Sequence, residues 1–476
     1  MRQAHPVQAV REAEAALMAT LPEGTLMQRA AAGLAAAAAD LMGRVYGARV
    51  TVLVGSGDNG GDALYAAARL ARRGAAVTAV LLAPDRAHPG GLTALRRAGG
   101  RVAAPHPNQL TEADLILDGI TGIGGKGGLR PDAAALVRAA SAPILAVDLP
   151  SGVDADTGEV HGEAVRAAAT VTFGTYKPGL LVDPARTHTG ALRLIDIGLT
   201  PYLTAPALEA PQHADIAALL PHPTAASDKY RRGVIGVVAG SERYPGAAVL
   251  AVAGALRGGA GAVRYVGPAA RAVVARWPEA LVHAGPPAKA GRVQAWVVGP
   301  GLGDGPEARQ AVEEVLASDV PVLVDADGLR FVHPDGLERR TAPTLLTPHA
   351  GEAAALLAVP RPEVEARSLQ HARELTARYG CTVLLKGSTT LVADGDAPVR
   401  VNPTGSPWLA TAGTGDILSG LTGSLLAAGL TTRDAATAGA YLHGLAAREA
   451  ARGAPIGAHD LADALPTVWR DVTRGA

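Results

Sequence analysis

The stretch VLVGSGDNGGDALYAAARLARRG, from Val52 to Gly74, carries a complete strand, turn and helix signal. A short apolar run is followed by closely spaced glycines, and then by alanine and leucine at helical spacing. Glycines let a backbone approach a ligand closely, and the start of the helix favours a phosphate. The spacing matches neither the strict GxGxxG dinucleotide fingerprint nor a P-loop. From this stretch alone, a ligand site and an ordinary turn with Asn59 and Asp62 as turn and cap residues are equally good interpretations.

The same signal recurs along the chain in two series of apolar runs that end in Gly, Asp or Ser. The first series occupies residues 50–57, 75–83, 113–122, 143–152, 169–175 and 192–198, and the second 233–241, 262–267, 295–303, 321–329, 343–349 and 381–388. Continuous apolar strands that alternate with helices indicate parallel sheets covered on both faces. We therefore predict an α/β fold whose functional residues lie at the carboxyl ends of the strands.

The length of 476 residues exceeds that of one ordinary core, so two domains are expected. The segment between the two series, residues 200–230, is rich in proline and alanine and is typical of a linker or docking segment. We place the boundary within it, which gives domains at residues 1–211 and 212–476.

Composition excludes several classes of protein. The 44 basic residues balance 44 acidic ones, and aromatic residues make up only 3%, so a nucleic-acid partner is not expected. The single cysteine, Cys381, excludes an internal disulfide and suits a reducing cytosol. Pro6 and nearby acids interrupt the N-terminus where a signal peptide needs an apolar core, and the run from Ala30 to Ala39 is too short to span a membrane. We expect a soluble cytoplasmic protein with no membrane partner.

Two acids in the first half follow apolar runs directly. Asp118 follows LIL, and Asp148 follows ILAV in ILAVDLPSG. Each could be an ordinary strand-end cap, but loops at the ends of neighbouring strands converge on one cleft. Asn59, Asp118 and Ser151 offer only oxygen ligands, which suit a hard cation better than zinc. Asp148 is then left as a candidate acid or base.

The motifs GDNGGDAL, LDGITGIGGKG and AVDLPSGVDADTG resemble those of the NAD(P)H-hydrate epimerase domain, and LMQRAA is similar to its N-terminal helix. The likeness covers about residues 1–211. It implies a Rossmann-like αβα sandwich that interconverts the R and S epimers at C6 of hydrated NADH or NADPH. It also implies that K⁺ is bound by Asn59, Asp118 and Ser151. The implied substrate contacts are Asp58, Asn59, Gly60, Gly61, Asp62, Gly122, Ile123, Gly124, Gly125, Lys126, Gly127, Gly128 and the catalytic candidate Asp148. Asp58 and Ala63 stand where the family usually has Asn and Gly.

The second half contains several further candidate motifs. In LLKGSTT, a strand ends at Lys386 and hydroxyl residues that can hold phosphates, although a lone strand-end lysine is more often simply solvated. In TPHAGE, His349 suits a ligand contact and a helix cap equally well. Gly301 and Gly303 permit close contact with a ring or phosphate, or merely a tight turn. Asp325 and Asp327 could reach Mg²⁺ through water, but acids are common in such turns.

Taken in order, GSERYPGAAVLAVAGALRGGAG, GPGLG, DADGL, TPHAGEAAALL, LLKGSTTLV and NPTGSPWLATAGTGDILSG resemble the ADP/ATP-dependent NAD(P)H-hydrate dehydratases. The resemblance runs from about Asp228 to the C-terminus and implies a ribokinase-like αβα domain. It implies that the hydrated cofactor is contacted by Ala247, Gly303, His349 and Asp416. It implies that the adenine nucleotide is contacted by Lys386, Gly387, Ser388, Thr389, Thr390 and Gly415. Asp416 would be the base that takes a proton from the substrate hydroxyl, and Mg²⁺ would accompany the nucleotide.

The two halves together predict a bifunctional enzyme that repairs hydrated NADH and NADPH, with ADP rather than ATP as the expected co-substrate and a homo-oligomer as the expected assembly. The alternative is a ribokinase-like kinase of a vitamin precursor, joined to a Rossmann-like domain that binds without catalysing. The GTGD loop, Gly413 to Asp416, suits both functions, whereas TPHAGE and the epimerase-like half favour repair.

Overall fold

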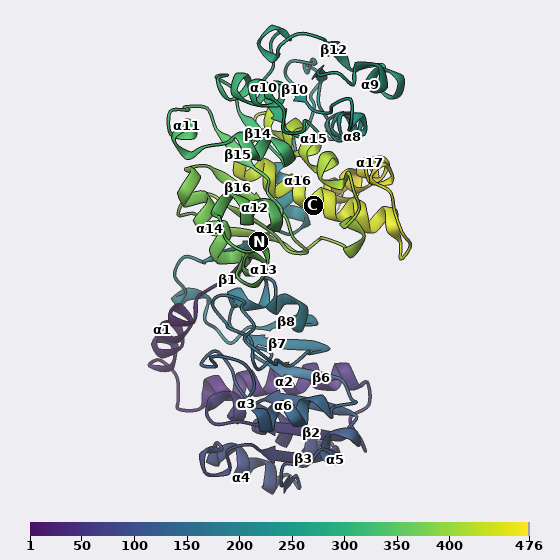
Figure 1. The fold of residues 1–476 in the computed structure, drawn as a ribbon. Coiled ribbons are helices and arrows are strands. Elements are labelled where there is room, and N and C mark those ends of the chain that lie inside the picture. Colours follow the sequence, from purple (N-terminus) through teal and green to yellow (C-terminus); the bar gives the residue numbers. More distant parts are fainter. Residues whose placement is uncertain (475–476) are drawn as a thin grey trace. The chain divides into compact units, whose positions relative to one another are not determined.

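The computed structural model describes residues 1–474. These residues form two compact units, one of residues 3–208 and the other of Met1–Arg2 together with the chain from Glu209 onward. Figure 1 shows that each unit is a sheet with helices packed on both sides. The α/β fold predicted from the apolar runs is therefore confirmed, and the two units divide three residues before the predicted boundary at Pro211.

The smaller unit contains a seven-stranded sheet with the order β4-β3-β2-β5-β6-β7-β8, in which all neighbouring strands are parallel. Its strands are β2 (Arg49–Val54), β3 (Ala76–Leu81), β4 (Arg101–Ala103), β5 (Leu115–Gly119), β6 (Ile144–Val147), β7 (Ala169–Phe173) and β8 (Ala191–Ile195). Its helices are α1 (Val7–Met18), α2 (Thr25–Met42), α3 (Asp58–Arg72), α4 (Pro89–Arg97), α5 (Asn108–Thr111) and α6 (Pro131–Arg138). One face of the sheet packs against α1 to α4, and the other packs against α5 and α6.

The glycine-rich turn of the opening stretch has a steric cause. Gly57 adopts a φ of 101°, which favours glycine, and α3 begins at the next residue. A Cβ on Gly55 would lie 1.9 Å from the carbonyl oxygen of Ile120, so the end of β2 can approach the end of β5 only because residue 55 is glycine. This close approach brings the loops after the two strands together.

The larger unit contains an eleven-stranded sheet with the order β1-β9-β18-β17-β16-β15-β14-β13-β10-β11-β12. The strands from β16 to β12 in this order are parallel, whereas β16, β17 and β18 pair antiparallel. The strands are β1 (Arg2–Ala4), β9 (Leu208–Ala210), β10 (Val234–Val238), β11 (Ala262–Val266), β12 (Leu281–His283), β13 (Ala295–Val298), β14 (Val322–Val324), β15 (Thr344–Leu346), β16 (Thr382–Leu385), β17 (Thr390–Ala393) and β18 (Val399–Asn402).

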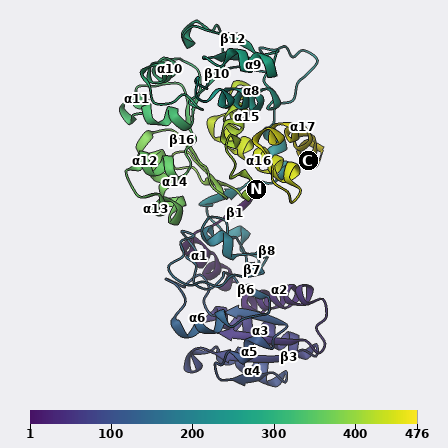
Figure 2. The same ribbon diagram turned by 45° about the vertical axis from the view of Figure 1, so that its right-hand side comes forward.

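Helices cover both faces of this second sheet (Figure 2). One face packs against α7 (His213–Leu219), α8 (Pro245–Arg257), α9 (Ala270–Arg276), α15 (Thr414–Ala427), α16 (Thr432–Ala451) and α17 (Ala458–Arg474). The other face carries α10 (Pro306–Leu316), α11 (Pro334–Glu338), α12 (Ala350–Leu357), α13 (Arg361–Ala366) and α14 (Ser368–Tyr379). The helices α8 and α15 lie in close contact, because Gly254 and Gly420 leave no Cβ between the two backbones.

The segment predicted as a linker or docking segment, residues 200–230, is more ordered than expected. It contains β9 and α7, and α7 begins with a capping box formed by Gln212 and Asp215. Ile216 and Leu220 are buried in the core of the larger unit. Of the two predictions for this segment, a linker or a docking segment, the second agrees with this part, because α7 packs onto the core of the larger unit. Within residues 1–474, no helix is long and apolar enough to cross a membrane.

Candidate active sites

In the smaller unit, Asp118 and Ser151 lie together at the carboxyl ends of β5 and β6. Both are completely buried, and the two Asp118 oxygens accept hydrogen bonds from the Ser151 hydroxyl at 2.7 Å and the Ser151 backbone amide at 2.8 Å. Burial raises the pKa of Asp118 to about 6, and the hydrogen bonds from Ser151 partly oppose this rise. The carboxylate is thus an unusually good partner for a positive charge.

Asn59 lies beside the glycine-rich loop of residues 122–128. A Cβ on Gly122 would lie 3.1 Å from the Asn59 side-chain oxygen, which shows how closely loop and side chain approach. The Asn59 side-chain nitrogen is buried and has no hydrogen-bond partner among residues 1–474. The other end of the loop points elsewhere, since Lys126 is exposed and pairs with Asp154 at 2.9 Å. The structure therefore brings Asn59 to the Gly122 end of this loop and leaves Lys126 at the surface.

Asp148, the candidate acid or base, is paired with a lysine that the sequence analysis did not consider. Lys177 is almost fully buried, and its ammonium group lies 2.5 Å from Asp148 Oδ1. Thr172 donates to the same carboxyl oxygen at 3.0 Å, and Lys177 also donates to the Thr172 hydroxyl and the Phe173 carbonyl. Asp148 adopts a φ of 67°, a strained conformation for a residue other than glycine. Strain and pairing together hold this carboxylate in one position.

Three further acids, Glu14, Asp58 and Asp62, lie close enough to the Asp148–Lys177 pair for their charges to interact with it. Burial raises the pKa of Asp62 well above its ordinary value, and the negative charges of Asp148, Asp58 and Glu14 raise it further. Burial likewise raises the pKa of Glu14, on α1. Asp58 to Asp62 at the start of α3 and Asp148 at the end of β6 are thus parts of one cluster, as their place at neighbouring strand ends predicts.

In the larger unit, Asp416 lies in the first turn of α15, directly after the GTGD loop. Gly413 has a φ of 89°, and a Cβ on Gly415 would lie 3.7 Å from the Lys386 ammonium group. Burial raises the pKa of Asp416 to about 7, and the charge of Asp325 raises it while that of Lys386 lowers it. Asp416 is therefore balanced between its two protonation states near neutral pH, as a general base should be.

Lys386 is held by Asp325 rather than by Asp416. The Lys386 ammonium group lies 2.6 Å from Asp325 Oδ1 and 3.7 Å from Glu352, and the Ser419 hydroxyl donates to Asp325 Oδ2 at 2.5 Å. Although burial disfavours its charge, Asp325 and Glu352 raise the pKa of Lys386, which keeps the ammonium group positive. The second acid of DADGL, Asp327, accepts a hydrogen bond from the Gly303 amide at 2.8 Å. Asp325 and Asp327 thus have structural partners.

A buried histidine fixes the start of α15. His443, on α16, hydrogen-bonds through Nε2 to the carbonyl of Thr414 at 2.8 Å. Burial lowers the pKa of His443 to about 4, so the ring is neutral at pH 7 and donates its Nε2 proton to this carbonyl. His443 therefore orients the peptide groups beside Asp416.

The other residues proposed for the second site surround this centre. Ala247, half-buried near the start of α8, would lie 2.6 Å from a Cβ on Gly301. His349 caps α12 by accepting from the Glu352 amide at 3.0 Å, and a backbone bridge joins His349 to Lys386. Residues 386–389 form the connection between the antiparallel strands β16 and β17, and Thr390 is the first residue of β17, an arrangement that was not predicted from the sequence.

Four members of these two sites were not predicted from the sequence: Lys177, Glu14, Ser419 and His443. Lys177 follows the apolar strand β7 by four residues, so the rule that led to Asp118 and Asp148 would have included it had it been applied to this strand. Ser419 lies one helical turn after Asp416, and this spacing could have predicted that both side chains lie on the same face of the helix. Nothing in the local pattern around Glu14 or His443 indicated a site.

Comparisons with known families and relatives match both halves of the chain. A family described as NAD(P)H-hydrate dehydratase matches residues 235–467, and a family described as YjeF-related protein N-terminus matches residues 23–179. The chain is 50% identical over 456 residues to a bifunctional NAD(P)H-hydrate repair enzyme of Mycobacterium leprae, covering 94% of each protein. It is 36% identical over 419 residues to the Escherichia coli enzyme of the same name, covering 83% of this chain and 79% of the relative.

Among solved structures, the larger unit is similar to an ADP/ATP-dependent NAD(P)H-hydrate dehydratase from Bacillus subtilis that was co-crystallised with ATP and Mg²⁺. That similarity has a TM-score of 0.51 and 33% identity, and it covers 55% of this chain and 97% of the other. A ribokinase-like superfamily protein from Enterococcus faecalis gives a TM-score of 0.51 at 24% identity, covering 57% of this chain and 99% of the other, which shows a shared fold.

Proposed function

The chain belongs to the family of bifunctional NAD(P)H-hydrate repair enzymes, and we propose that its two reactions depend on Asp148 in the smaller unit and Asp416 in the larger one. An enzyme of this family interconverts the R and S epimers of hydrated NADH and NADPH and dehydrates the S epimer at the expense of a nucleotide. The observation that carries the proposal is Asp416, whose pKa is raised to about 7 at the start of a helix beside Lys386.

In the dehydration, Asp416 takes the proton of the C6 hydroxyl, and the oxygen attacks the terminal phosphorus of the nucleotide. The bond to the leaving nucleotide breaks, and Lys386 and the amide groups of Gly413 to Gly415 stabilise the developing negative charge. The ring nitrogen's electron pair then expels phosphate from C6. Loss of a proton from C5 completes the double bond and restores the reduced nicotinamide.

The hydrated cofactor is proposed to contact Ala247, Gly303, His349 and Asp416. The nucleotide is proposed to contact the segment from Lys386 to Thr390 and the backbone of Gly415, where a Cβ would lie 3.7 Å from the Lys386 ammonium group. Because Asp325 and Asp327 already have partners, Mg²⁺ fits best as an ion carried by the nucleotide's phosphates and water. ADP is the expected co-substrate.

In the epimerisation, Asp148 takes the proton of the C6 hydroxyl, the C6–N1 bond breaks with its electron pair left on the ring nitrogen, and C6 becomes an aldehyde carbon. The nitrogen then attacks the other face of this carbon and Asp148 returns the proton, while Lys177 keeps the carboxylate in place. The proposed substrate contacts are Asp58 to Asp62 and Gly122 to Gly128. Lys177 therefore fixes the position from which Asp148 faces the substrate.

K⁺ is proposed to bind at Asn59, Asp118 and Ser151. The fit rests on the buried charge of Asp118, which no side-chain cation neutralises among residues 1–474, and on a donor set of amide, carboxylate and hydroxyl oxygens. Bound there, the ion would supply a fixed positive charge at the strand ends and orient the loop that begins at Gly122.

The test is an assay of purified R and S hydrates, each with ADP or ATP, that follows recovery of the reduced nicotinamide's absorbance. We expect both epimers to be repaired by the intact chain and only the S epimer by the Asp148→Asn variant. Equal use of both epimers by that variant would refute the role of Asp148, and a stable phosphorylated product without recovered absorbance would refute the dehydration. The expected homo-oligomer is a separate prediction, to be checked by sedimentation.

A further inference from the structure

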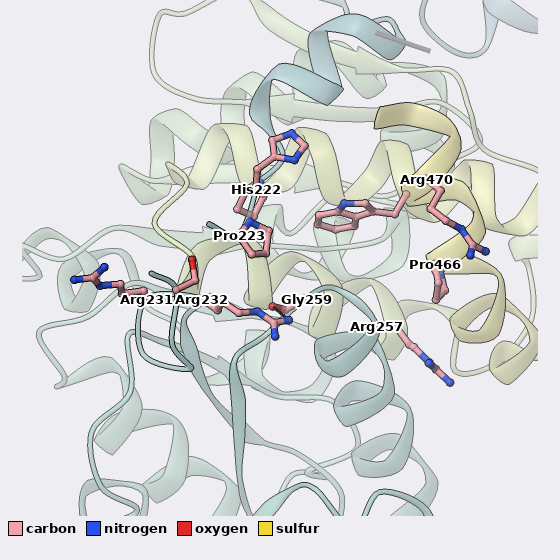
Figure 3. A pocket seen from close by; sticks show the side chains of 11 residues that line it. His222, Pro223, Arg231, Arg232, Arg257, Gly259, Pro466 and Arg470 are labelled. Carbon is pink, nitrogen blue, oxygen red and sulfur yellow. Dashed lines mark hydrogen bonds between the residues drawn. The ribbon is translucent and has the colours of Figure 1, made fainter. Parts of the chain in front are cut away.

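A pocket of about 370 Å³ lies in the larger unit, away from the strand ends that carry Lys386 and Asp416 (Figure 3). Its lining comes from the loop after α7, the loop that leads into β10, and parts of α8 and α17. Arg232 precedes β10, which begins at Val234, so the pocket lies at the amino ends of the parallel strands. The helix α8 runs between the two ends, and its 13 residues span about 20 Å. The pocket is therefore separate from the proposed reaction site.

The pocket is strongly basic. Arg231, Arg232, Arg257 and Arg470 all line it, and Figure 3 shows them on different sides. Within residues 1–474, only Arg257 among these four forms an ion pair with a carboxylate, at 3.5 Å from Asp463. The positive charge of this pocket is thus mostly uncompensated by the protein.

Two of these arginines, Arg232 and Arg470, donate hydrogen bonds to neutral groups. Arg232 donates to the carbonyl of Gly259 at 3.1 Å, and Arg470 donates to the Thr467 hydroxyl at 3.1 Å. A guanidinium group has five N–H donors in a planar fork that matches phosphate oxygens. Both arginines are therefore restrained in position while most of their donors stay available to an anion.

The end of a helix does not by itself explain this arrangement. The carbonyl end of α8 favours nearby cations, which accounts for Arg257 and Arg232. It accounts neither for Arg470, which is on α17, nor for the apolar part of the pocket. That part is formed by Pro221, Pro223 and the half-buried indole of Trp469. An indole face beside arginines is suited to stack a flat ring whose phosphates the arginines bind.

We propose that this pocket is a second nucleotide-binding site, with the base against Trp469 and the phosphates on Arg232 and Arg470. A volume of about 370 Å³ is at the small end of ligand pockets, which suits a mononucleotide better than a dinucleotide. The site is additional to the nucleotide contacts at Lys386 and does not depend on them.

Isothermal titration calorimetry with ADP tests the proposal. The intact chain should bind two equivalents of ADP, the Lys386→Ala variant should retain the pocket's equivalent, and the Arg232→Gln/Arg470→Gln variant should retain only that of the reaction site. The latter variant should dehydrate the S hydrate at the normal rate with saturating ADP, which shows that it is folded. The matched control is Arg292→Gln/Arg339→Gln, which changes two exposed arginines outside the pocket and should still bind two equivalents.

One equivalent in the intact chain and none in Lys386→Ala would overturn the proposal. Two equivalents that survive Lys386→Ala would instead contradict the role of Lys386 and leave the pocket standing, so the two failures are distinguishable. Inorganic pyrophosphate separates anion binding from nucleotide binding. Trp469→Leu should weaken ADP at the pocket by about tenfold without affecting pyrophosphate. Equal loss of both ligands, or none of either, would rule out recognition of the base.

Discussion

Each unit contains a lysine paired with an aspartate at the strand ends. In one unit the paired aspartate is the proposed catalytic acid, and in the other it is a neighbour of that acid. In the smaller unit, Lys177 lies 2.5 Å from Asp148, the proposed catalytic acid itself. In the larger unit, Lys386 lies 2.6 Å from Asp325, and no cation among residues 1–474 forms an ion pair with Asp416. Burial and the charge of Asp325 then raise the pKa of Asp416 to about 7. Lys177 thus holds the carboxylate of Asp148 in place, whereas Lys386 pairs with another acid and Asp416 can take up and release a proton near neutral pH.

The largest expected effect comes from removing the unpaired acid. Asp416→Asn should lower the rate of dehydration by about a thousandfold or more, because a proton acceptor contributes on that order and the amide cannot replace it. Epimerisation should be unchanged, which can be followed by interconversion of R and S hydrates without nucleotide. The control is Asp396→Asn, an exposed acid in the turn between β17 and β18. Nucleotide-dependent repair that survives in Asp416→Asn would overturn the assignment.

The paired acid should respond to loss of its cation. Lys177→Met should lower the rate of epimerisation by about a hundredfold, since Asp148 would lose the group that holds its carboxylate and compensates its charge. Dehydration of the S hydrate, measured in the same preparation, should remain normal and shows that the larger unit is intact. Far-UV circular dichroism monitors folding.

Lys177→Arg separates positioning from charge alone. An arginine keeps the positive charge, so it should restore part of the lost epimerisation if charge compensation matters, with a changed pH profile. If Lys177→Met epimerises as fast as the intact chain while remaining folded, the pair is structural only.

The positions of several site residues were predictable from the sequence. Asp118, Asp148 and Lys386 follow apolar runs, and the rule that parallel strands present ligands at their carboxyl ends placed each of them at a strand end. The pairings were not predictable in the same way. Lys177 meets Asp148 across 29 residues and Lys386 meets Asp325 across 61, and both contacts depend on side-chain conformations that no local pattern encodes. Only the structure therefore shows that Lys386 pairs with Asp325 and not with Asp416.

Similar reasons explain what else was missed. The composition of residues 200–230 predicted either a linker or a docking segment, and it did not indicate that α7 forms there and buries Ile216 against the core. The residues from Lys386 onward were predicted as a phosphate-binding strand end, whereas the structure places them in a tight hairpin between the antiparallel strands β16 and β17. The pocket beside Trp469 combines side chains from segments more than 200 residues apart, such as His222 and Arg470, so it left no motif.

A smaller effect, but a more specific one, is the pH dependence of dehydration. Because Asp416 must be ionised to accept a proton and its pKa is about 7, kcat should fall about tenfold for each pH unit below 7 and level off above it. The measurement is kcat for the S hydrate with saturating nucleotide, and a flat profile through neutral pH would contradict an unpaired Asp416.

The smallest expected effect is on stability. The folded state retains the Asp416 proton up to about pH 7, whereas the unfolded chain releases it near the ordinary value of 3.8, so the folded state loses stability as the pH rises between these values. Asp416→Asn removes this cost and should raise the free energy of unfolding of the larger unit by about 1–3 kcal/mol at pH 8, with no gain near pH 4. Urea unfolding followed by tryptophan fluorescence measures this directly, because all 4 tryptophans lie in the larger unit. If the variant is as stable as the intact chain at pH 8, the carboxylate is better solvated than its surroundings indicate. Its difference from the paired Asp148 would then lie in geometry rather than in charge.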